Sequence, residues 1–174
     1  MGMEFWPSLA ASVLLLLAFI ILLWHAAIDL KLRLLPDELT AALIVLGLAF
    51  HWAVYPYAGS WQSVLMGAIV GFGALAFVRA IANKYYGFET MGLGDVKLML
   101  AFGIWLGPDG VLFTLMAGAF AGVLHGLGLM LYARSHGSHA EFREMTVPAG
   151  PGFCVGAVLA AIWQFRMLPL FGGF

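Results

Sequence analysis

Long apolar stretches, separated by short turns containing charged residues, glycine or proline, follow one another along the whole chain of 174 residues. A transmembrane helix needs about 20 mostly apolar residues, whereas the strands of a membrane barrel alternate in units of about 10 residues. Hydrophobic residues make up 63% of the chain and charged residues 10%, with a mean hydropathy of +0.99. A soluble globule needs more polar surface than that. We therefore predict an all-α, polytopic membrane protein.

The pattern predicts a single membrane domain over residues 1–174, with about six transmembrane helices. The expected spans are residues 5–28, 38–55, 60–82, 95–106, 111–132 and 149–168. At 1.5 Å per residue, the roughly 12 residues of the fourth span cover about 18 Å of the ~30 Å of hydrocarbon. We therefore expect its first residue, Asp95, to lie below the membrane surface in a water-accessible cavity.

The basic residues are distributed unevenly between the two expected membrane faces. Lysine and arginine are enriched in cytoplasmic loops. Seven of the eight basic residues fall beside the turns after the first, third and fifth spans, and only Arg166 falls on the other side: Lys31, Arg33, Arg79, Lys84, Lys97, Arg134 and Arg143. This bias predicts that both termini lie outside the cytoplasm and that Asp29 and Asp95 share the cytoplasmic side.

Several classes of site are not expected in this chain. The sequence has no basic patch that would indicate nucleic-acid binding. The single cysteine, Cys154, excludes an intramolecular disulfide and a multi-cysteine metal site. We interpret four acidic and histidine side chains in one polar loop as solvated residues rather than metal ligands: His136, His139, Glu141 and Glu144. Neither a metal nor a cofactor is predicted.

The stretch Met91–Lys97 places Asp95 behind Gly92 and Gly94, directly before an apolar run. Charged groups at membrane depth are costly and usually functional. Asp29, at the end of the first apolar stretch, is the expected partner of Asp95. Two neighbouring carboxyl groups resist ionising together, so one can activate water while the other keeps a proton. The glycines leave room for a substrate backbone.

Other residues near these aspartates have supporting or structural interpretations. Pro36 suits the approach to a helix, and Asp37 is a plausible N-cap. Lys97 does not share a helix face with Asp95, because positions i and i+2 do not meet, so we expect it to reach lipid phosphate or hold the loop. His25, one turn before Asp29, is expected to bond that carboxylate or to pack. Asp95 as a simple N-cap, and Asp29 as an ion-pair partner of a nearby basic residue, remain open.

Two motifs resemble those of the type IV prepilin peptidase family of GxGD aspartyl proteases. The first is Asp29 followed by Leu34-Leu35-Pro36-Asp37-Glu38-Leu39-Thr40, and the second is Gly92-Leu93-Gly94-Asp95-Val96-Lys97-Leu98. The segment from Val147 to Pro151 is a weaker third match, to the entry of the last helix. The short loop after Asp29 and the single cysteine depart from the bifunctional members, which carry a cysteine-containing region associated with N-methylation. The short, single-function members are therefore the more similar ones.

The resemblance implies a protease of the bacterial cytoplasmic membrane that removes the leader of type IV prepilin or pseudopilin precursors at the cytoplasmic face. Asp29 and Asp95 would be its catalytic pair, with Gly92, Gly94, Lys97, Pro36 and Asp37 in substrate-binding or supporting roles. The expected partners are the precursor and the lipid bilayer. Alternatives are another GxGD intramembrane protease, a proton-coupled transporter, and a structural subunit of a secretion complex.

Overall fold

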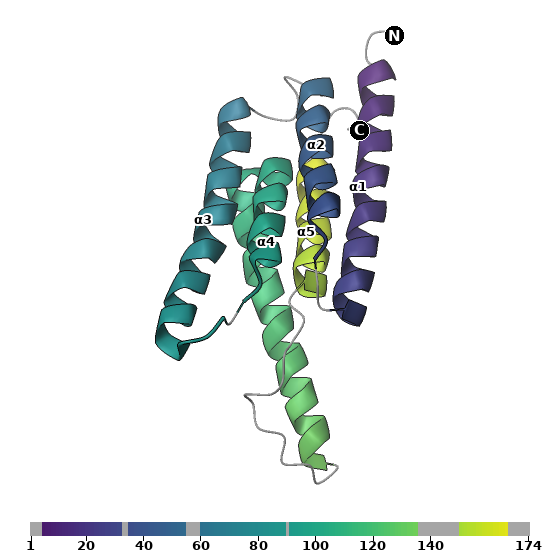
Figure 1. The fold of residues 1–174 in the computed structure, drawn as a ribbon. Coiled ribbons are helices and arrows are strands. Elements are labelled where there is room, and N and C mark those ends of the chain that lie inside the picture. The colour runs from purple at the N-terminus through teal and green to yellow at the C-terminus, as the bar shows by residue number, and fades with distance from the viewer. Residues whose placement is uncertain (1–4, 33–34, 55–59, 90, 136–149, 167–174) are drawn as a thin grey trace.

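The computed structural model describes residues 5–32, 35–54, 60–89, 91–135 and 150–166. These residues form helices and turns and include no strand. The helices are α1 (Phe5–Leu32), α2 (Asp37–Ala53), α3 (Trp61–Tyr86), α4 (Leu93–Ser135) and α5 (Gly150–Phe165). Helix α3 packs on α4, while α2 and α5 lie between α4 and α1 (Figure 1). The predicted all-α class is confirmed.

Helix α4 is folded back on itself at Gly107, whose φ of 66° and ψ of −173° are not helical. Met99 and Val111 would lie about 18 Å apart in a straight helix. Both nevertheless come within 4 Å of the position that a Cβ on Gly71 would occupy. We call residues 93–106 the first arm of α4 and residues 108–135 the second arm. A turn therefore lies at residues 107–110, between the fourth and fifth expected spans and within α4.

The second arm of α4 returns toward the end of the bundle where it began. It packs antiparallel to α5, because Gly110 lies beside Gln164 near the end of α5 while Gly118 lies beside Phe153 near its start. Figure 1 shows this arm extending beyond the start of α5. The first arm, by contrast, is enclosed: residues 101–107 are all buried. The start of α4, which carries Asp95, is thereby held on a packed helix.

Helices α3 and α4 touch backbone to backbone through Gly67 and Gly103. A Cβ on either glycine would collide with the carbonyl oxygen of the other. Small residues of this kind allow membrane helices to approach closely. Gly73, in contrast, has nothing within 4 Å of its Cβ position. Gly67 and Gly71 therefore allow the close packing of α3 on α4, and Gly73 does not take part in it.

Two hydrogen bonds from side chains to backbone carbonyl oxygens join α2 to the first arm of α4. Trp105 donates its indole N–H to the carbonyl oxygen of Leu43 at 2.9 Å. His51 Nε2 lies 2.9 Å from the carbonyl oxygen of Ile104 and donates to it. In an unbroken helix that carbonyl would accept from residue 108, but Pro108 has no N–H. His51 therefore supplies the donor that proline removes.

The helix boundaries differ from the expected spans mainly at one end of the bundle. Helix α1 continues to Leu32 rather than 28, so Asp29 lies inside it, and α3 continues to Tyr86 rather than 82. The expected polar loop over residues 83–94 is thus partly helical, with a non-helical segment between Tyr86 and Leu93. The predicted limits at residues 55, 149 and 168 lie outside the described part of the chain.

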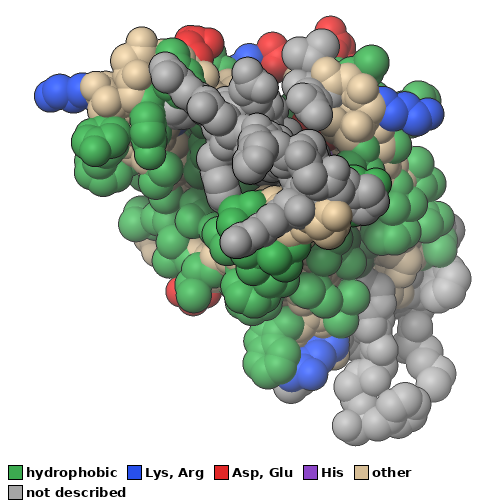
Figure 2. All heavy atoms as spheres, turned by 90° about the horizontal axis from the view of Figure 1, so that it is seen from below, with side chains coloured by type: hydrophobic (Ala, Val, Ile, Leu, Met, Phe, Trp, Pro, Cys, Tyr) green, Lys and Arg blue, Asp and Glu red, His purple; other side chains and the backbone are tan. Residues whose placement is uncertain are grey.

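Among the described residues, three helical stretches are long and apolar enough to cross a membrane: Ser8–Leu32, Trp61–Tyr86 and Leu93–Tyr132. The last includes Gly107, so its length is shared between the two arms of α4. Helix α5 is apolar but shorter. Many large apolar side chains point outward, including Leu16, Trp24 and Phe77. Seen along the helices from the end where α4 begins, hydrophobic side chains make up most of the described surface and charged ones lie mainly along its margin (Figure 2).

Candidate active site

Asp29 and Asp95 lie at the same end of the bundle, where α1 ends and α4 begins (Figure 1). Their carboxyl groups are close enough to interact electrostatically. Asp29 is buried, with 4% of its surface exposed, and Asp95 is partly buried. The two aspartates that the sequence singled out are therefore brought together by the fold, within a largely apolar bundle.

Asp29 is held from α5. The backbone N–H of Gly150, the first residue of α5, donates to Oδ2 of Asp29 at 3.1 Å. A Cβ at Gly150 would approach that oxygen to 2.5 Å, so only glycine fits here without moving the carboxylate. Sequence reasoning did not assign Gly150 to the site. The only signal for it was the proline- and glycine-containing segment before the last apolar stretch.

Asp95 has an unused oxygen. Its Oδ1 atom is buried and has no hydrogen-bond partner among the described residues. Buried carboxylate oxygens normally have a partner, so an orphaned one suggests that a proton, water or substrate group completes the site. A Cβ at Gly92 would lie 3.8 Å from Oδ2 of Asp95, an ordinary van der Waals contact. The Cβ position of Gly94, however, is only 2.9 Å from Leu35, so this glycine serves packing.

The segment that leads into Asp95 is tied to α3 by Arg79. Its Nε–H donates to the carbonyl oxygen of Met91 at 2.9 Å, and its Nη2 lies 3.1 Å from Oε1 of Glu89. The Arg79 side chain is 19% exposed and that of Glu89 is 84% exposed. Arg79 thus fixes the backbone four residues before Asp95, a role that sequence reasoning did not give it.

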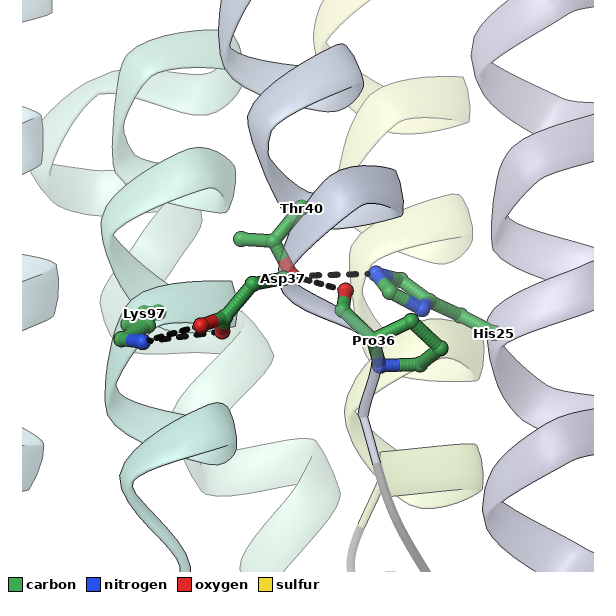
Figure 3. Close-up of polar contacts among 5 residues, drawn as sticks. All are labelled: His25, Pro36, Asp37, Thr40 and Lys97. Atoms are coloured by element: carbon green, nitrogen blue, oxygen red, sulfur yellow. Dashed lines mark hydrogen bonds and ion pairs between the residues drawn. The ribbon is translucent and has the colours of Figure 1, made fainter.

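Asp37 and Lys97 form an ion pair between α2 and the first arm of α4. Lys97 Nζ lies 2.8 Å from Oδ1 and 2.7 Å from Oδ2 of Asp37 (Figure 3). The expectation that Asp37 caps α2 is wrong. Pro36 occupies the N-cap position without a side-chain cap, and Asp37 is the first helical residue. Its carboxylate turns outward to the ammonium group rather than back to the helix N–H groups.

His25 bonds a neighbouring helix rather than Asp29. Its Nε2 lies 3.2 Å from the hydroxyl oxygen of Thr40, which in turn is 3.4 Å from the carbonyl oxygen of Pro36 (Figure 3). Its Nδ1 is buried without a hydrogen-bond partner in the described residues. Of the two interpretations of His25, packing is confirmed, since the histidine is a buried link between α1 and α2 that bonds Thr40.

Cys154 is a free, buried thiol on α5, near Asp29 and Asp95. It follows Gly150 by one helical turn, which places both on one face of α5. The polar-loop residues His136, His139, Glu141 and Glu144 lie outside the described residues, as do residues 147–149 of the third matching segment.

Comparisons with known proteins agree with this constellation. The family model described as the Type IV leader peptidase family matches residues 16–127, a range that includes both aspartates. A relative from Aeromonas salmonicida strain A449 is 33% identical over 158 residues, covering 91% of this chain and 50% of its own length. Relatives from Aeromonas hydrophila (32% over 161 residues, 91% and 50%) and Pectobacterium carotovorum (32% over 164 residues, 92% and 52%) are similar.

All three relatives are named prepilin leader peptidase/N-methyltransferase. The chain spans about half the length of these curated relatives. No solved structure matches it. Because the family model covers well over half of the residues and takes in the two aspartates that the fold brings together, the chain belongs to the Type IV leader peptidase family.

Proposed function

We propose that this chain is a membrane aspartyl endopeptidase that removes the leader peptide of type IV prepilin or pseudopilin precursors. The observation that carries the proposal is the approach of Asp29 from α1 and Asp95 from α4 at one end of the bundle. Membership of the Type IV leader peptidase family supports the reaction class. The names of the relatives support the substrate class.

The proposed chemistry needs only the two carboxyl groups and water. One carboxylate takes a proton from a water molecule, which attacks the carbonyl carbon of the scissile peptide bond. The protonated carboxyl hydrogen-bonds the carbonyl oxygen and later passes its proton to the leaving amine. The Gly150 N–H holds one oxygen of Asp29 and thus fixes its orientation. The unpartnered Oδ1 of Asp95 is available to the water or to the substrate carbonyl.

An apolar cavity of about 390 Å³ supports the proposal that the substrate has a hydrophobic segment. It lies among α1, α2, the first arm of α4 and α5, and its lining includes Ala18, Leu22, Ala157 and Ala161. Leu22 is about two helical turns from Asp29, and Ala157 about two turns from Gly150, so the cavity continues along the helix faces that carry the site. In this proposal the apolar segment that follows the cleavage point binds there.

The side of the membrane also belongs to the proposal. Lys31, Lys84 and Lys97 all lie toward the end of the bundle that carries Asp29 and Asp95, and Arg166 follows the opposite end of α5. Under the positive-inside rule, the aspartate end faces the cytoplasm and both termini lie outside. In this arrangement six helical segments, counting the arms of α4 separately, lie in the bacterial cytoplasmic membrane.

The test is co-expression of the chain with candidate precursors, followed by gel shift and by mass spectrometry of the cut site. Asp29→Asn and Asp95→Asn should each abolish processing without preventing membrane insertion. Asp109→Asn, at an exposed aspartate beside the Gly107 turn, is the matched control and should process normally. Full cleavage by either active-site variant would rule out the proposed chemistry. A cut within the membrane helix rather than at the leader boundary would rule out the proposed substrate class.

A further inference from the structure

The two helices that carry the aspartates make little direct contact with each other. Helices α1 and α4 each pack against α2 and against α5 instead (Figure 1). The separation of Asp29 and Asp95 is therefore set through intermediates. On the α5 side, the intermediate is the Gly150 N–H that holds Asp29. On the α2 side, the polar links nearest to the aspartates come from the first turn of that helix.

The first turn of α2 bonds both neighbours within four residues. Asp37 pairs with Lys97 of α4, with both carboxylate oxygens within 2.8 Å of Nζ. Thr40 shares a hydrogen bond of 3.2 Å with His25 of α1. With the Thr40 hydroxyl donating to the carbonyl of Pro36, the His25 Nε2–H donates to the hydroxyl. Figure 3 shows the two links leaving opposite sides of this turn.

Each link ends close to one of the aspartates along its helix. His25 lies one helical turn before Asp29, and Lys97 lies two residues after Asp95. The α1 link is fully enclosed, since His25 is 0% and Thr40 3% exposed. The ion pair is not: the Lys97 side chain is 45% exposed and that of Asp37 is 65% exposed. Exposed ion pairs add little to global stability, so the effect expected from this pair is local alignment.

We propose that the first turn of α2 is a positioning element, in which Asp37 and Thr40 set the distance between the carboxyl groups of Asp29 and Asp95. Neither residue touches the reacting atoms. Asp37 acts through Lys97 on the first turn of α4, and Thr40 acts through His25 on the last turns of α1. The expected effect on cleavage rests on the proposed function, whereas the expected effect on the distance between Asp29 and Asp95 does not.

The kinetic test compares kcat and KM for precursor cleavage. Asp37→Asn and Lys97→Met should each lower kcat by about 10-fold with little change in KM, because misplacing a catalytic group by about 1 Å can cost as much as 100-fold. The charge swap Asp37→Lys with Lys97→Asp should restore most of the loss. Thr40→Val should lower kcat. Thr40→Ser keeps the hydroxyl group and should therefore have the wild-type kcat. Glu38→Gln, an exposed carboxylate in the same turn, is the control.

A distance measurement keeps the proposal separate from the protease assignment. Spin labels on Leu30→Cys and Leu93→Cys, two exposed positions beside the aspartates, report the spacing of α1 and α4 by pulsed electron resonance. Cys154 is buried and can stay in place. The distribution should broaden or shift in Asp37→Asn and Lys97→Met, recover in the charge swap and remain unchanged in Glu38→Gln.

The possible outcomes distinguish the two proposals. Unchanged distances and unchanged kcat in Asp37→Asn and Lys97→Met would overturn the positioning role, as would losses that the charge swap leaves unrepaired. A chain that cleaves no precursor but shows the shifted distances would overturn the proposed function while supporting the positioning element.

Discussion

Gly150 donates its backbone N–H to Oδ2 of Asp29 over 3.1 Å, although the two residues are 121 positions apart in the sequence. The bond orients the Asp29 carboxylate from α5, a helix far from α1 in the sequence. It also explains why a residue without a side chain begins α5. Any atom added at that Cα would occupy the space beside the carboxylate oxygen.

Replacing Gly150 by alanine should therefore lower kcat for precursor cleavage by at least about 10-fold, because a catalytic group displaced by about 1 Å can lose up to 100-fold in rate. Gly122→Ala is the matched control, since the Cβ position of Gly122 has nothing within 4 Å. Steady-state cleavage assays on purified protein in detergent would measure both. An alanine at 150 with the wild-type kcat would mean that Asp29 is not oriented from α5.

Gly67→Ala should destabilise the bundle by about 1–3 kcal/mol, the usual cost of forcing extra atoms into a packed interface. The new methyl group would meet the carbonyl oxygen of Gly103, which is backbone and cannot rotate away. Gly73→Ala is the control, because Gly73 lies about two turns from Gly67 in α3 and has nothing within 4 Å of its Cβ position. This substitution should change the free energy of unfolding by less than about 1 kcal/mol. Denaturant-induced unfolding in mixed micelles gives both values, and equal effects would contradict the close contact.

His51→Leu should lower the free energy of unfolding by about 1–3 kcal/mol, because leaving a buried carbonyl oxygen without a donor costs roughly that much. The carbonyl concerned is that of Ile104, which Pro108 cannot serve. His125→Leu, on an exposed histidine of the second arm of α4, should stay within about 0.5 kcal/mol. Thermal unfolding in detergent would compare the two variants. An equal loss of stability in both variants would show that the loss in His51→Leu does not come from its hydrogen bond to Ile104.

Ala161→Phe should raise KM for a precursor by about 10-fold, equivalent to about 1.4 kcal/mol of binding. The added ring would fill part of the apolar cavity between α1 and α5. Val155→Phe places the same ring on an outward position of α5 that is 61% exposed, and should leave KM unchanged. If a short soluble leader peptide without the apolar segment is cleaved equally by both variants, the cavity acts on that segment, as proposed.

Much of the architecture could be predicted because hydrophobicity along a chain reports on membrane helices directly. The Gly107-Pro108-Asp109-Gly110 turn was visible in the sequence, since glycine supplies the positive φ and proline ends the preceding hydrogen-bond ladder. Asp29 and Asp95 attracted notice for a similar reason: a carboxylate is conspicuous beside an apolar run. Their approach in space follows from which helices become neighbours, and hydropathy says nothing about that.

The contacts between helices were harder to predict, because the partners lie far apart in sequence and are common residue types. Gly150 acts through its backbone, and His51 and Thr40 each bond a different helix. The misassigned Asp37 shows the same limit. Asp37 had a good local use as a helix cap, but Lys97, 60 positions away, is its ion-pair partner. His25 packs as expected, but its partner Thr40 on another helix was not predicted.

The fold in α4 has a consequence for how deep Asp95 sits in the bilayer. Its first arm ends at a glycine with φ of 66° followed by a proline, and a histidine from α2 bonds the carbonyl oxygen of Ile104 near that end. The arm therefore cannot gain or lose a turn at that end. In the proposed membrane arrangement, Asp95 keeps its depth because the far end of the first arm is fixed to the core, so lipid thickness should change the hydration of Asp95 before it changes its position.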